Sequence, residues 1–189
     1  MSVPTVSDSD SAPSRPRSRR LSPAARKAVV LLHVVSSVGW LSLMLCLLTL
    51  GVSGLVTRDA ETLRSSYRAM RILGDALIVP LSLLSLTSGL ALALGTPWRL
   101  FQYRWVSTKF WLTLAATTAS VFALTARLHE AADLATGHPT GSIADMHLGF
   151  ARYNMVIVPS VALTLYLVTV TLSVFKPWGR RTGWKADGT

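Results

Sequence analysis

The chain has 189 residues, of which 50% are hydrophobic and 15% are charged, with 19 Lys and Arg against 9 Asp and Glu. Soluble domains carry about 25% charged residues, so this composition excludes an ordinary water-soluble domain and indicates a membrane protein. The single cysteine, Cys46, excludes an intramolecular disulfide and a cysteine-based zinc cluster.

The first 26 residues contain Ser, Pro, Asp and Arg and almost no large apolar side chains. Such a segment cannot bury enough surface to offset the entropy of ordering, so we expect residues 1–26 to be a disordered basic arm. Residues 29–56 then carry no charge. They exceed the roughly 20 residues that cross a hydrocarbon core and the roughly 7 to 15 of a signal peptide, and therefore predict a first transmembrane helix.

Three further apolar segments follow, at about 70–95, 105–126 and 153–175. Each must be helical in a bilayer, because backbone groups find no water there to bond. We therefore predict an all-α protein in which residues 27–178 form a four-transmembrane-helix bundle and 179–189 a short basic tail. Four spans place both termini on one side of the membrane.

The distribution of positive charge orients this bundle. Most of the Lys and Arg residues lie in the arm, in the connection after the second span and in the tail, so the positive-inside rule predicts that both termini are cytoplasmic. Trp98, Trp105 and Trp178 fall at the predicted inner boundary, where indole rings are favoured. The basic residues are thus explained by anionic lipid headgroups at the inner face, and we expect no nucleic acid as a partner.

Two ionisable residues within the predicted spans support a chemical hypothesis. His33 lies about 7 to 8 Å into the first span and Lys109 about 6 Å into the third, from the same side. His33 could be a neutral packing residue or an axial ligand of haem or copper. Lys109 could extend to the interface, or it could receive an anionic group such as a propionate.

Polar and aromatic residues recur at helical spacing beside these two. From His33 the stripe continues through Ser36, Ser37, Trp40 and Met44, and we include Trp40 among the candidate cofactor-binding residues. Small and hydroxyl-bearing residues form similar stripes on the other spans, and most of them are explained by close packing of membrane helices.

At the opposite side of the membrane, Asp75 lies one turn after Arg71 and at the level of Arg152. We expect a structural ion pair among these three residues. His129 and Asp133 have a one-turn spacing that a divalent metal could use, although polar residues in such a connection also serve solubility.

Four motifs carry a resemblance to a known family. The segments LHVVSSVGW (32–40), GTPW (95–98), RWVSTK (104–109) and KPWG (176–179) resemble a family of uncharacterised four-helix bacterial integral membrane proteins. The resemblance covers most of the chain and implies a multi-pass protein of the bacterial plasma membrane. It implies no known activity.

A more distant resemblance concerns haem. A first-span His followed by Trp, a Trp-x-x-x-Lys opening the third span and a last span from Arg-x-Asn to Lys-Pro are similar to J-type haem-dependent protoporphyrinogen IX oxidases and to copper-resistance D-type membrane proteins. The functional His and Lys of the oxidases correspond to His33 and Lys109, which implies a haem b site. The last span departs from the oxidase pattern, because Met155 rather than an acidic residue follows Asn154 and the proline comes late, at Pro159.

We therefore predict a multi-pass membrane protein that binds b-type haem in the inner half of the bundle; the sequence assigns it no activity. The alternative is a non-enzymatic membrane accessory subunit or a small transporter, including one that handles copper. For either function, the protein could form a homo-oligomer or bind a membrane partner.

Overall fold

The computed structural model describes residues 21–95, 104–138 and 140–175, and every regular element in these ranges is helical. The elements are α1 (Pro23–Val56), α2 (Ala60–Gly95), α3 (Arg104–Thr118), a π-helical turn η1 (Ala119–Leu124), α4 (Thr125–Thr136), a 3-10 turn η2 (Ala144–Met146) and α5 (Ala151–Phe175). Helices α3 and α4 are joined through η1 into one long helix. Within the described ranges, four helices are long and apolar enough to cross a membrane, which confirms the predicted all-α architecture.

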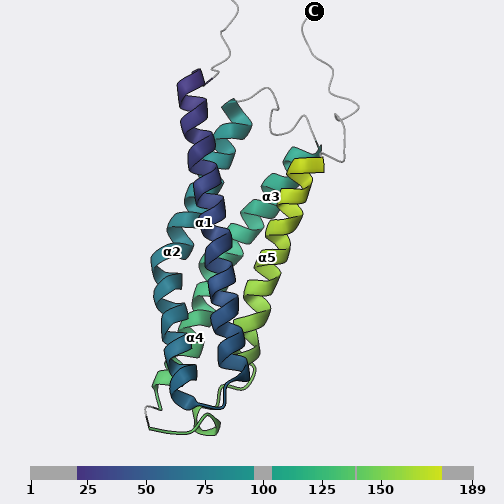
Figure 1. Cartoon of the computed structure of the whole chain (residues 1–189). Coiled ribbons are helices and arrows are strands. Elements are labelled where there is room, and N and C mark those ends of the chain that lie inside the picture. Colours follow the sequence, from purple (N-terminus) through teal and green to yellow (C-terminus); the bar gives the residue numbers. More distant parts are fainter. Residues whose placement is uncertain (1–20, 96–103, 139, 176–189) are drawn as a thin grey trace, which may run out of the picture.

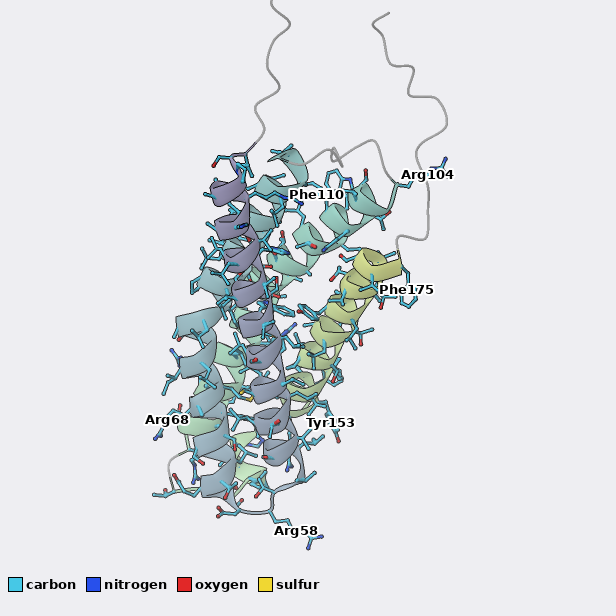
Figure 2. All side chains as sticks on the ribbon, turned by 45° about the horizontal axis from the view of Figure 1, so that its top comes forward. Arg58, Arg68, Arg104, Phe110, Tyr153 and Phe175 are labelled. Atoms are coloured by element: carbon cyan, nitrogen blue, oxygen red, sulfur yellow. The ribbon has the colours of Figure 1, made fainter. Side chains whose placement is uncertain are left out.

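The helices run up and down, and α1 begins at the same end of the molecule at which α5 finishes (Figure 1). We call this the terminal end. The opposite end, which carries residues 57–59, 137–138 and 140–150, is called the loop end. Arg104 lies at the terminal end and Arg58 at the loop end (Figure 2). The side of the membrane that each end faces stays a prediction from the charge distribution.

Two helices extend beyond the predicted spans at the loop end. Helix α2 begins at Ala60 rather than near residue 70, and α4 continues to Thr136 rather than ending near residue 126. With 36 residues, α2 is about 54 Å long at about 1.5 Å per residue, whereas the hydrocarbon core is about 30 Å thick. The apolar stretches therefore locate the membrane crossings but not the helix ends.

Local capping explains where α1 and α2 begin. The Ser22 hydroxyl accepts a hydrogen bond from the Ala25 amide at 3.2 Å, so α1 starts at Pro23 and the last residues of the predicted arm are helical. Asp59 accepts bonds from the Thr62 hydroxyl at 2.5 Å and the Thr62 amide at 2.8 Å. These bonds hold the pKa of the Asp59 carboxyl below its usual value, and they identify Asp59 as the N-cap of α2.

The tightest packing lies in the middle and at the loop end. Buried side chains there include Met44, Leu47, Leu63, Tyr67, Met70, Leu128, Ala131, Met146 and Met155. Gly51 lets α1 approach α5 very closely, because a Cβ atom at this position would overlap the Met155 carbonyl oxygen. Towards the terminal end α1 and α5 diverge (Figure 1), and cavities are found between the helices there.

Candidate functional site

A cavity of about 270 Å³ lies between α1, α3 and α5 in the terminal half of the bundle. Helix α2 also contributes to its wall. Its polar lining residues are His33, Ser37, Trp40, Ser82, Ser85, Lys109, Thr113, Thr117, Tyr166, Thr169 and Ser173. Both ionisable residues singled out from the sequence, His33 and Lys109, therefore line one cavity.

The His33 ring is held against α2. Its Nδ1 atom lies 3.1 Å from the Ser85 carbonyl oxygen and 3.1 Å from the Ser88 hydroxyl. A carbonyl oxygen can only accept, so Nδ1 carries a proton, and in the neutral imidazole Nε2 then keeps its lone pair. Within the described residues, no hydrogen bond reaches Nε2. Gly89 permits this position, because a Cβ there would lie 3.1 Å from His33 Cε1.

Lys109 faces the bundle and not the membrane surface. Its ammonium group donates a hydrogen bond to the Ser173 hydroxyl of α5 at 2.6 Å. Ser173 in turn donates to the Thr169 carbonyl at 3.1 Å. Lys109 thus crosses from α3 to α5 and brings a positive charge to the cavity that His33 also lines.

Trp40 and Tyr166 form an aromatic wall of the same cavity. The two rings are stacked, with centroids 5.9 Å apart and planes inclined by 19°. The Trp40 indole N–H donates to the Ser82 hydroxyl at 3.1 Å, which orients the ring. Trp40 therefore lies where the sequence analysis placed it, on the face of α1 that carries His33.

The predicted ion pair at the other end of the bundle is correct for two of its three members. Arg71 Nε lies 3.9 Å from Asp75 Oδ2, and Arg71 Nη1 bonds Asp133 at 2.5 Å. Asp75 Oδ1 lies 2.7 Å from His129 Nε2. The third member, Arg152, was wrongly predicted to join them.

Arg152 instead closes the end of α1. Its guanidinium group donates to the carbonyl oxygens of Gly54 at 3.2 Å, Leu55 at 2.8 Å and Thr57 at 3.0 Å. The last carbonyl groups of a helix have no partner within that helix. Arg152 stands in the first turn of α5, beside these carbonyls, and satisfies them.

His129 and Asp133 were considered above as metal ligands. In the structure His129 pairs with Asp75, and Asp133 pairs with Arg71, both across the α2–α4 contact. Over the described ranges, no group of three or more His, Cys, Asp or Glu side chains is arranged to hold a metal ion. These two residues thus join α4 to α2.

One structural residue was missed. Arg64, counted above only among the positive charges, is buried, and its guanidinium donates to the carbonyls of His138 at 2.8 and 3.1 Å and of Gly141 at 2.5 Å. It anchors the loop-end connection. Its spacing from Leu63, Tyr67 and Met70 on the buried face of α2 is the signal that could have identified it.

Trp98, Trp178, most of the predicted arm (1–20) and the predicted tail lie outside the described residues, as does the Trp105 side chain. Fold and site together define a helical multi-pass membrane protein with a largely apolar cavity in one half of the bundle, into whose wall polar and aromatic side chains are set. No family model matches the chain, and no curated protein or solved structure is significantly similar to it.

Proposed function

We propose that this protein binds b-type haem in the plasma membrane of a bacterium, with both termini in the cytoplasm and with His33 as the axial ligand. The topology and address rest on the charge distribution and on the motifs resembling bacterial integral membrane proteins. The haem proposal rests chiefly on one observation, the hydrogen bond between His33 Nδ1 and the Ser85 carbonyl.

This bond supports the proposal because it selects the reactive nitrogen. A metal-ligating histidine almost always donates its other ring N–H to a carbonyl, carboxylate or water, which fixes the tautomer and the ring orientation. In His33 this requirement is met by α2, and Nε2 is the nitrogen left to bind a metal. His33 therefore has the tautomer that a haem-ligating histidine needs.

The other lining residues suit the remaining parts of such a ligand. Lys109 would receive an anionic propionate, since Lys109 lines the cavity and its ammonium group bonds a neutral hydroxyl, that of Ser173, among the described residues. The stacked Trp40 and Tyr166 rings would pack against an apolar macrocycle.

The residues that line the cavity also determine how many protein ligands a haem iron could have there. Among the described lining residues, His33 is the only His, Cys or Met side chain of this cavity. A haem held by His33 would have this one ligand among the described lining residues, and it would supply binding of a small ligand or one-electron chemistry. His33 and Lys109 would bind and orient the group.

The test is an absorption spectrum of the detergent-purified protein after expression with added haem precursor. We expect a Soret band in the wild type that is lost in His33→Ala. His129→Ala is the matched control, because this histidine lies at the loop end and should leave the band unchanged. A wild-type protein without a Soret band, or an unchanged band in His33→Ala, contradicts the proposal.

A second proposal comes from a different class. His33 already has two partners on α2, Ser85 and Ser88, as a packing residue would. In that case the protein is a non-enzymatic accessory subunit or small transporter, including one for copper. A stoichiometric membrane partner without bound chromophore would favour the accessory role, and copper binding lost in His33→Ala would favour copper handling.

A further inference from the structure

A second cavity, of about 310 Å³, lies at the terminal end between α1, α2 and α3. It meets the first cavity at His33 and Lys109, which line both. Its far limit on α1 is Arg26, which precedes His33 by seven residues and hence by about 10 Å along the helix axis. This second cavity therefore extends from the level of His33 to the terminal end of the bundle.

Most of the wall of this cavity is apolar. The contributing side chains are Val30 on α1, Leu86, Leu90, Leu92 and Ala93 on α2, and Val106 and Phe110 on α3. Phe110 lies near the terminal end (Figure 2). Such a wall suits a hydrocarbon chain.

The charges of the cavity have one sign. Arg26 and Lys109 are the charged residues that line it, and no Asp or Glu is among its described lining residues. Arg26 is exposed and stands just before the uncharged run of α1, at the depth where arginine meets lipid phosphates. An apolar cavity with a guanidinium at its outer limit is complementary to an amphiphile with an anionic headgroup.

We propose that this cavity is a binding site for one anionic phospholipid from the leaflet at the terminal end, with its phosphate on Arg26 and one acyl chain along Leu86, Leu90 and Phe110. The bound chain would form the outer wall of the His33 site. The proposal rests on Arg26 and the apolar wall, so it stands or falls separately from haem binding.

The first experiment tests the headgroup. Delipidated protein in detergent is titrated with phosphatidylglycerol or with phosphatidylcholine of the same acyl chains, and bound lipid is counted by native mass spectrometry. We expect one phosphatidylglycerol per chain, bound about fivefold more tightly than phosphatidylcholine, as one arginine–headgroup contact predicts. Arg26→Ala should abolish this preference.

Lys27→Ala is the matched control, since it removes the same charge from the next residue, and Lys27 does not line the cavity. It should retain the preference. Equal binding of the two lipids by the wild type, or equal losses in Arg26→Ala and Lys27→Ala, would overturn the proposal in favour of general attraction to the surface.

The second experiment tests the acyl chain. Ala93→Phe places a large ring in the cavity, whereas Ala91→Phe makes the same change two residues away, at a position that does not line it. We expect Ala93→Phe to lose the tightly bound lipid and Ala91→Phe to keep it, with equal helical content by circular dichroism. Equal lipid binding by the two variants would refute the site. The Soret band of Arg26→Ala, recorded on the same samples, should match the wild type.

Discussion

Replacing Arg152 with methionine removes three hydrogen bonds from a charged donor to the carbonyls that end α1. A hydrogen bond to a charged group contributes about 1.5 to 3 kcal/mol when it is buried. Because Arg152 is only half-buried and the three bonds share one group, we expect a total loss of about 2 to 4 kcal/mol. Methionine preserves much of the apolar stem, so the loss reports the guanidinium.

The assay is thermal unfolding in detergent, followed by the helical signal in circular dichroism. For a protein of this size 1 kcal/mol corresponds to about 2 to 4 °C, so the Tm of Arg152→Met should fall by roughly 4 to 16 °C. Arg68→Met is the matched control. Arg68 is exposed and points away from the helices (Figure 2), and its replacement should change the free energy of unfolding by less than about 0.5 kcal/mol.

A double-mutant cycle separates this role from the ion pair predicted from the sequence. Asp75 bonds Arg71 and His129, whereas Arg152 bonds the carbonyls of α1. Since the two side chains share no partner in the described residues, Asp75→Asn and Arg152→Met should be additive within about 0.5 kcal/mol. A larger coupling energy, or a Tm for Arg152→Met equal to that of the wild type, would refute the carbonyl-capping role.

Three further predictions concern backbone approach and capping. Gly51→Ala should lower the unfolding free energy by about 1 to 3 kcal/mol, because the new Cβ overlaps the Met155 carbonyl; an unchanged Tm would contradict this contact. Gly89→Ala should reduce the haem retained per protein, measured by the Soret absorbance, because its Cβ would lie 3.1 Å from the His33 ring. Asp59→Ala should lower the Tm at neutral pH. Because the pKa of Asp59 is lowered in the folded state, this Tm difference should shrink as the pH falls below about 4, through that pKa.

The sequence predicted the helices because lipid imposes one strong rule, that apolar segments of sufficient length become helices. It did not predict where α2 begins, since residues 60–68 lie in a polar extension whose start is set by the Asp59 cap. It did not predict the partners of Arg152 either. Depth along a helix can be counted from the sequence, but the neighbour that each face meets depends on how the helices are rotated and packed.

In the candidate site, too, depth could be predicted from the sequence and contacts could not. Equal depth suggested that His33 and Lys109 could share a site, and the structure adds that both line one cavity. The ring orientation of His33 was not predictable, since it depends on a carbonyl of α2 and on the missing side chain of Gly89. No residue type signals a backbone carbonyl in a sequence.

The two halves of the bundle are packed differently. At the loop end the buried Arg64 and the half-buried Arg152 bond backbone carbonyls, and α4 is joined to α2 by ion pairs. These contacts hold the helices together where the chain turns. In the terminal half, by contrast, α1 and α5 diverge (Figure 1) and cavities lie beside His33 and Lys109.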